Sequence, residues 1–216
     1  MAAAGKIAFL TRMARAGYHH GDLKQALLDT SLTLLDESGV SGLTLQKAAK
    51  RQGVSAAAVY RHYASKEELL AAIAEQGFTL LRDAVYAALD HRPRQSTRAL
   101  FRRSVAAYID LALRKPHHYE LMFGAAIPAN HEYTELRARG EEAFEGLLET
   151  VRVCQAEGLF KRRKPIVLAF QVWSTMPGYV MLHIAGRNPF PIDDSAQLKR
   201  LTGLLVQFLR RGLERD

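Results

Sequence analysis

Three helix starts between residues 44 and 65 constrain the fold of this chain more than any other feature. Thr44, Ser55 and Ser65 are preferred N-cap residues, because their side-chain oxygens accept hydrogen bonds from free backbone N–H groups. An apolar residue lies just before each cap and another lies four residues after it, which is the pattern of a hydrophobic staple. Repeated stapling fixes the angle at which each helix begins, so the sequence predicts short helices in a rigid arrangement.

The segment 43–63 has the spacing of a helix-turn-helix. We expect one helix over residues 45–51 and a second from Ser55 to His62. Gly53 lies in the turn between them, because a residue without Cβ adopts positive φ freely. The second helix begins with a serine and three alanines, and this slim end fits a DNA major groove. We therefore predict that this segment binds DNA.

Polar and charged side chains of the second helix are the candidate DNA contacts. Lys66 opens the helix that follows, where a cation opposes the helix dipole, so an external anion would explain its position. Free N–H groups at the start of the second helix also favour phosphate. The predicted contacts from the residues themselves are Ser55, Ala56, Ala57, Ala58, Tyr60, Arg61, His62 and Lys66.

The net charge favours an anionic partner. The chain carries 30 Lys and Arg against 22 Asp and Glu, a net charge of +8. Nine bases against four acids within residues 1–66 place +5 of that charge beside the helix-turn-helix. Such an excess suits nucleic acid or an anionic membrane surface. No apolar run approaches the roughly 20 residues of a membrane span, so we expect a cytoplasmic protein with no membrane partner.

Helical periodicity continues to the C-terminus. We predict an all-α fold with an N-terminal three-helix helix-turn-helix domain and a C-terminal helical bundle that dimerises. The predicted domains are a flexible basic arm over 1–17, the DNA-binding domain over 18–66, and an effector-binding and dimerisation domain over 67–216. Outside the helix-turn-helix, the expected helices cover residues 22–37, 66–89, 96–114, 116–124, 131–157, 164–186 and 194–214.

The last predicted helix carries an apolar stripe that is too wide for one neighbouring helix. Leu198, Leu201, Leu205 and Phe208 recur at spacings of three and four residues. We therefore expect the helices of a partner subunit to cover part of this stripe, together with the helix 164–186.

Bulky side chains of the C-terminal half either line a ligand cavity or fill the core, since an apolar pocket uses the same residue types. Pro177 should bend or break the helix 164–186, because proline leaves the Trp173 carbonyl without its N–H partner. Alternatively, Pro177 starts a new helix after a turn. The candidate ligand-binding residues are Phe101, Tyr108, Met122, Trp173, Met176, Tyr179 and His183.

No pattern in the sequence indicates a metal, a cofactor or an enzyme. The single cysteine, Cys154, excludes multi-cysteine zinc modules. The pairs His19-His20 and His117-His118 are adjacent, and adjacent residues on a helix do not face the same way. Nucleophile-elbow, P-loop, H-E-x-x-H and dinucleotide-binding motifs are absent. A non-specific DNA-coating protein and, more remotely, a helical-bundle enzyme are the alternatives to a regulator.

Residues 18–73 resemble the DNA-binding domain of the TetR family of transcriptional regulators. The similarity lies in Tyr-His-His-Gly-Asp-Leu, Leu-Leu-Asp-Glu-Ser-Gly, Gly-Val-Ser, Val-Tyr-Arg-His-Tyr and Lys-Glu-Glu-Leu-Leu, within about a quarter of the chain. The resemblance implies a homodimer that represses transcription from a palindromic operator and is released by a small-molecule effector. It also implies DNA contacts at Thr44, Ala56, Ala57, Ala58, Tyr60, Arg61, His62 and Lys66.

The C-terminal half resembles the variant of this family whose effector domain carries a Trp-x-x-x-His-Gly signature. The matching residues here run from Trp173 to Gly178, with Pro177 in place of the histidine. Any role of that histidine therefore does not transfer to this chain.

Overall fold

The computed structural model describes residues 20–90, 96–128, 133–189 and 194–214, and the expected basic arm over 1–17 lies outside them. The chain divides into two compact units, with the division between Leu69 and Leu70. The described secondary structure is helical, apart from one isolated bridge between Phe160 and Glu214. The predicted all-α fold is therefore confirmed.

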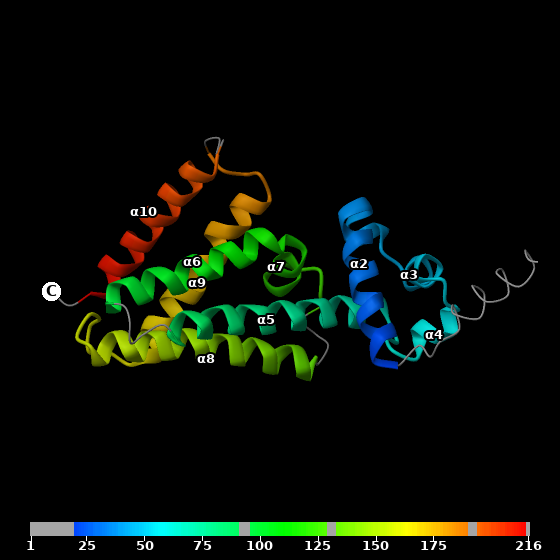
Figure 1. Ribbon diagram of the computed structural model, residues 1–216, viewed down its shortest axis with the longest axis horizontal. Coiled ribbons are helices and arrows are strands. Elements are labelled where there is room, and N and C mark those ends of the chain that lie inside the picture. The colour runs from blue at the N-terminus through cyan, green and yellow to red at the C-terminus, as the bar shows by residue number, and fades with distance from the viewer. Residues whose placement is uncertain (1–19, 91–95, 129–132, 190–193, 215–216) are drawn as a thin grey trace, which may run out of the picture. The chain divides into compact units, whose positions relative to one another are not determined.

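The first unit contains a helix-turn-helix preceded by a longer helix (Figure 1). The second of its helices packs against both the first and the third. The fourth helix begins in this unit and ends in the second unit. These helices are α2 (His20–Gly42), α3 (Leu45–Gln52), α4 (Ala56–Tyr60) and α5 (Lys66–Asp90).

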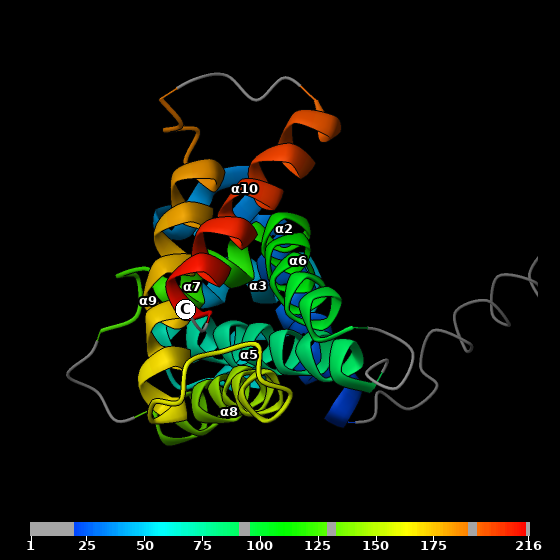
Figure 2. The ribbon, with the colours of Figure 1, turned by 90° about the vertical axis from the view of Figure 1, so that its left-hand side faces the viewer.

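The second unit is a helical bundle around one apolar core (Figures 1 and 2). Both views show α5 beside the long helix 134–156, and Arg82 of α5 pairs with Glu142 of that helix at 2.7 Å. After α5 its helices are α6 (Thr97–Arg114), α7 (Pro116–Phe123), α8 (Thr134–Ala156), α9 (Pro165–Ile184) and α10 (Ser195–Leu213). Helix α6 is central, because it contacts α7, α8, α9 and α10.

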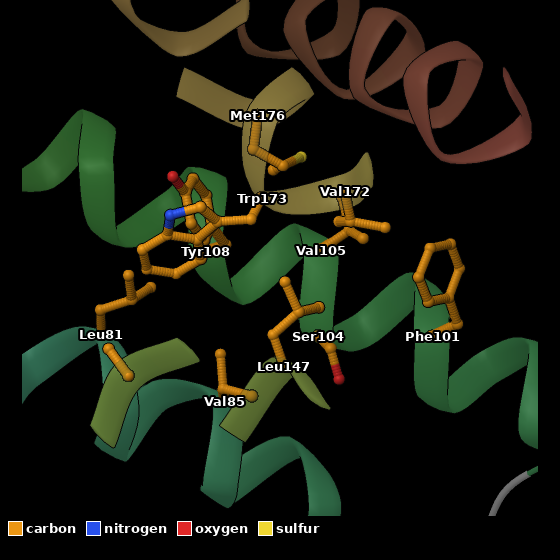
Figure 3. A pocket seen from close by; sticks show the side chains of 11 residues that line it. Leu81, Val85, Phe101, Ser104, Val105, Tyr108, Leu147, Val172, Trp173 and Met176 are labelled. Atoms are coloured by element: carbon orange, nitrogen blue, oxygen red, sulfur yellow. The ribbon is translucent and has the colours of Figure 1, made fainter. Parts of the chain in front are cut away.

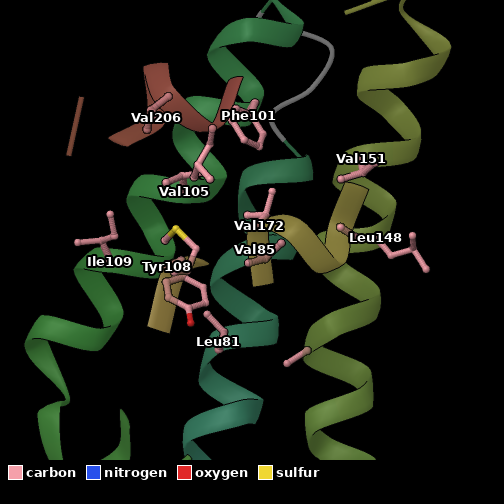
Figure 4. Packing of buried hydrophobic residues seen from close by; sticks show 14 of the residues in the cluster. Leu81, Val85, Phe101, Val105, Tyr108, Ile109, Leu148, Val151, Val172 and Val206 are labelled. Atoms are coloured by element: carbon pink, nitrogen blue, oxygen red, sulfur yellow. The ribbon is translucent and has the colours of Figure 1, made fainter. Parts of the chain in front are cut away.

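Aliphatic and aromatic side chains hold this bundle together (Figure 4). Val85 of α5, Val105 of α6 and Val172 of α9 gather at its centre and are almost fully buried. The buried rings of Phe101 and Phe160 meet edge to face, with their centroids 5.1 Å apart. Burial of such side chains stabilises the fold by about 1.5–3 kcal/mol each.

The helix ranges predicted from the sequence agree with the structure to within a few residues. The first helix differs most, because α2 begins before residue 22 and includes a further turn after Gly39. Gly39 has φ 63° and ψ −175°, so the helical backbone is interrupted at the glycine that was expected to end it.

Helix α9 continues without a break through Pro177. The prediction that Pro177 breaks the helix is therefore wrong, and so is the alternative that it starts a new one; a bend at Pro177 stays a prediction. Val172, Met176 and Val180 lie on both sides of the proline and are all buried. Their packing in the core outweighs the loss of one backbone hydrogen bond at the Trp173 carbonyl.

Helix α9 also corrects the expectation that no segment is apolar enough to cross a membrane. Among the helices of the described residues it is the one that meets that criterion by length and composition. Residues 165–184 contain no Asp, Glu, Lys or Arg, although polar residues interrupt the apolar run. Its apolar side chains divide between the core and an outward face with exposed Ile166, Val167, Phe170 and Leu182.

Replacing Gly53 by alanine should destabilise the first unit by about 1–2 kcal/mol, because its φ of 72° lies in the left-handed region. Gly203→Ala is the matched control, since this glycine lies inside α10 with open space around its Cβ position. It should stabilise the chain by about 0.5–1 kcal/mol. Urea unfolding followed by circular dichroism measures both changes, and two shifts of the same sign would contradict this reading.

Candidate nucleic-acid interface and ligand cavity

Side-chain caps fix the start of α3 and of α4. The Thr44 hydroxyl accepts a hydrogen bond from the Lys47 N–H at 3.1 Å, and the Ser55 hydroxyl accepts one from the Ala58 N–H at 3.2 Å. Thr44 and Ser55 are therefore confirmed as N-caps. Because each hydroxyl binds a backbone group of its own helix, the first role of both residues is to position that helix.

The turn between the two helices depends on Gly53. Its N–H and that of Val54 donate to carbonyls at the end of α3, which closes the helix while the glycine adopts a left-handed conformation. Below the turn, Ala48 and Val59 have no exposed surface. The small alanine lets α3 and α4 approach closely, so the two helices are held as one body.

The third cap is at the start of α5. The Ser65 hydroxyl accepts a hydrogen bond from the Glu68 N–H at 3.1 Å, as the capping-box pattern predicts. The Glu68 carboxylate accepts a hydrogen bond from the N–H of Ala64 at 2.7 Å. The reciprocal bond of this box therefore reaches the residue before the cap.

Lys66 has a partner inside the protein. Its ammonium donates a hydrogen bond to the Val40 carbonyl, and the Lys47 ammonium donates to the Gly42 carbonyl at 2.7 Å. Both cations therefore satisfy carbonyl groups at the end of α2. An external anion is not needed to explain the position of Lys66, so that argument no longer supports its DNA contact, which stays a prediction.

The exposed surface of α4 is small and mostly uncharged. Ala56, Ala57 and Arg61 are exposed, as a groove-binding surface requires, and 46% of the Tyr60 surface is accessible. Ala58 differs, because it is buried beside Val59. The methyl group of Ala58 therefore packs inside this unit, and a DNA contact at Ala58 stays a prediction.

One polar residue of this surface was missed by the sequence analysis. The Gln46 side-chain amide donates a hydrogen bond to the Tyr60 hydroxyl at 3.1 Å. This bond joins exposed residues of α3 and α4, so Gln46 belongs to the same surface. The sequence could have indicated Gln46, because it is a polar residue in the first turn of α3.

The charged residues between 44 and 66 are all basic. Residues 44–66 include the bases Lys47, Lys50, Arg51, Arg61 and Lys66 and contain no Asp or Glu. The carboxylate of an α2 residue, Glu37, binds the Arg51 guanidinium through two hydrogen bonds, and this contact lowers the pKa of Glu37. Lys50 and Arg61 are therefore the exposed cations best placed to meet an anionic ligand.

Four of the predicted ligand-binding residues line one cavity in the second unit (Figure 3). Phe101 and Tyr108 come from α6, and Trp173 and Met176 come from α9. The gaps between these side chains amount to about 410 Å³ when adjoining open solvent is included, but only about 20 Å³ can hold the centre of a water-sized molecule, so the wall side chains nearly fill the cavity. The wall residues that sequence analysis missed are Leu81, Val85, Ser104, Val105, Ala143, Leu147 and Val172.

The other three predicted ligand-binding residues do not line this cavity. Met122 lines separate hollows, beside Gly77 in one and beside Ile127 in another. The His183 ring nitrogen pairs with the side-chain amide of Asn188 at 3.2 Å. The Tyr179 hydroxyl is buried without a hydrogen-bond partner among the described residues. Side-chain size alone could not distinguish these three residues from the residues that line the cavity.

The described histidines, carboxylates and cysteine do not form a group of three or more that could hold a metal ion. His117 pairs with Glu120 at 3.2 Å, and buried His118 pairs with Gln76 at 3.0 Å. Each of these adjacent histidines therefore has a structural partner of its own.

Both units are similar to known protein families. The family described as bacterial regulatory proteins, tetR family, matches residues 27–73. The family described as tetracyclin repressor-like, C-terminal domain, matches residues 101–205. The two matches together cover α3 and α4 in the first unit and most of the cavity wall in the second.

Individual relatives give the same result. The nucleoid occlusion factor SlmA of Haemophilus ducreyi is 28% identical over 166 residues, which cover 76% of this chain and 78% of that protein. The tetracycline repressor protein class C of Escherichia coli is 40% identical over 57 residues, 26% of each chain. The second match is therefore confined to a segment of both proteins.

Solved structures share this fold. A protein of unknown function from Rhodococcus sp. RHA1 has a TM-score of 0.77 and 28% identity, and the match covers 93% of this chain and 100% of the other. The TetR family regulator PfmR of Thermus thermophilus has a TM-score of 0.65 and 21% identity, with 88% of this chain and 99% of the other covered. The likeness to PfmR shows the fold alone.

If α3 and α4 bind DNA as predicted, Arg61→Ala should weaken binding to duplexes of any sequence, because the surface loses one cation. The slope of log K against log salt concentration should fall in magnitude by about 1, as expected for one phosphate contact. Gel-shift titrations at several salt concentrations measure this slope. Arg162→Ala removes the same charge from an exposed position of the second unit and should leave the slope unchanged. Equal slopes for Arg61→Ala and the wild type would refute the assignment.

Proposed function

We propose that this chain, which belongs to the TetR family of bacterial transcriptional regulators, is a repressor that binds a palindromic operator as a homodimer. In this proposal a small molecule enters the second unit and releases the protein from DNA. Members of this family are DNA-binding regulators and not enzymes. The repressor role, the operator symmetry and the effector are the proposed parts, together with a cytoplasmic location.

The main support for DNA binding is that α3 and α4 form a rigid, exposed and basic pair of helices. Caps at both helices and the Gly53 turn fix its shape, and Tyr60 and Arg61 project from it. A preformed surface loses little conformational entropy on binding. The exposed alanines of α4 let its backbone approach the major groove, where thymine methyl groups and DNA shape would provide specificity.

The proposed dimer interface is an outward apolar face on α9 and α10. Phe170 of α9 is 60% exposed, and Phe208 of α10 is 68% exposed. Leu182 and Leu204 are about half exposed on the same two helices. Large apolar side chains gathered on two helices favour contact with another protein surface, and a second copy of the same helices would form an interface with twofold symmetry.

Helix α9 supplies a physical link between the proposed effector and the proposed dimer. Trp173 and Met176 line the cavity, while Phe170 and Leu182 lie on the outward face of the same helix. A ligand that displaces the cavity side of α9 would therefore shift its dimer side. Operator binding is sensitive to such a shift, because two reading helices must reach half-sites about one DNA turn (~34 Å) apart.

A second candidate function is non-specific DNA coating. It is favoured by the basic charge of residues 44–66, because contacts to phosphate bind duplexes of any sequence. A coating protein would not require a ligand cavity in its second unit. The cavity beneath Trp173 therefore favours the effector-controlled regulator.

A comparison of two affinities separates these functions. One is the affinity of the protein for DNA from the promoter region beside its own gene, and the other is its affinity for a random duplex of equal length. Both titrations are made at one salt concentration, because the phosphate contribution depends strongly on salt. A specific regulator should bind the promoter fragment at least about 10³-fold more tightly. Equal affinities would support the coating function and contradict the proposed repressor.

Phe208→Asp should convert the dimer to a monomer and abolish operator binding, because a buried charge replaces a large apolar contact at the interface. The side chain is 68% exposed in the single chain, so the fold itself should be retained. Light scattering measures the mass and circular dichroism checks the fold. Arg162→Asp, at an exposed position outside α9 and α10, should remain dimeric. A wild-type mass near 24 kDa at micromolar concentration would rule out the proposed dimer.

A further inference from the structure

We propose that the cavity between α5, α6, α8 and α9 takes an uncharged, mainly apolar molecule with one hydroxyl or carbonyl oxygen, which the Ser104 hydroxyl binds. This inference rests on the proposed function, because it names the chemical class of the effector for the same cavity. It follows from the lining of the cavity, from one unpaired polar group in its wall, and from the position of Trp173.

The cavity wall contains no charged side chain. Eight of its eleven lining residues are aliphatic residues, Met176 or Phe101, and the remaining three are Ser104, Tyr108 and Trp173. Burial and the neighbouring Tyr119 raise the pKa of Tyr108 well above its usual value, so this phenol remains neutral. A carboxylate or ammonium group in the cavity would be buried without a counter-charge, which is strongly unfavourable.

Ser104 is the unpaired polar group of this wall. It is 4% exposed, and its hydroxyl has no hydrogen-bond partner among the described residues. Other buried hydroxyls in helices of this chain bind the carbonyl one turn earlier, as Ser31 and Thr150 do at 2.7 and 3.0 Å. The Tyr108 hydroxyl is already engaged with that of Tyr119 at 2.6 Å. Ser104 is therefore left to pair with a ligand oxygen.

Trp173 lines both the cavity and a second hollow. Phe144 and Ile166 line this second hollow. The indole meets the Phe144 and Phe123 rings edge to face at 5.4 and 5.5 Å between centroids. A ligand that enters the narrow cavity must displace Trp173 or the adaptable Met176. Because Trp173 is the only tryptophan of the chain, its fluorescence reports this event directly.

Three probes of equal chain length test the chemical class. The full-length protein is titrated at pH 7.5 with 1-octanol, octanoate and octylammonium, and binding is followed by Trp173 fluorescence and by calorimetry. Octanol should bind saturably and more than about tenfold more tightly than either charged probe. Octanoate or octylammonium affinity equal to that of octanol would overturn the inference, and so would the absence of saturable octanol binding.

Two variants test the role of Ser104. Ser104→Ala should weaken octanol binding by about three- to tenfold, because the hydrogen bond to the ligand oxygen is lost. The same variant should raise the melting temperature of the free protein, because it removes an unpaired buried hydroxyl. Ser31→Ala removes a buried hydroxyl that is already bonded, in the first unit, and should leave octanol affinity unchanged. Unchanged octanol affinity in Ser104→Ala would overturn the assignment of this residue.

Gel shifts without any probe separate the two levels of the proposal. Promoter binding that persists while no octanol binding is found would refute the ligand class and leave the DNA-binding function standing. Saturable octanol binding without any specific DNA binding would refute the proposed repressor while the ligand site remained.

Discussion

The position of α4 is the constraint on which the function of this chain depends. A helix of five residues is far below the ~12–15 residues at which isolated helices become even marginally stable in water. It is held in place by the Ser55 cap, by the left-handed Gly53 and by the fully buried Val59. Tyr60 and Arg61 can be presented to DNA in a fixed geometry only because this short helix has no freedom of its own.

In the second unit the proposed function depends on helix α9, because its apolar residues face in several directions. One side fills the core through Leu168 and Val180, another lines the cavity, and a third faces outward. Exposed apolar side chains on the outward side of a helix favour contact with another protein. A partner subunit would bury this side, and it would place the ligand cavity one helix away from the dimer interface.

Local signals in the sequence predicted the helix ends and the helix-turn-helix, because N-caps and a left-handed glycine act over three or four residues. Features that depend on distant residues could not be predicted in this way. Lys66 binds the Val40 carbonyl 26 residues away, and Ala58 faces inward because of its neighbours in space. Ser104 carries no signal in the sequence, since its importance lies in the absence of a hydrogen bond inside the folded unit.

Selection from a library of random duplexes tests the central claim most directly. The wild-type protein is incubated with the library at near-physiological salt, and the bound duplexes are amplified and sequenced over several rounds. A dimer that presents two rigid α4 helices should enrich an inverted repeat whose half-sites lie about one DNA turn (~34 Å) apart. Enrichment of a single unpaired half-site, or no enriched sequence at all, would contradict the account of a dimeric regulator that reads a palindrome.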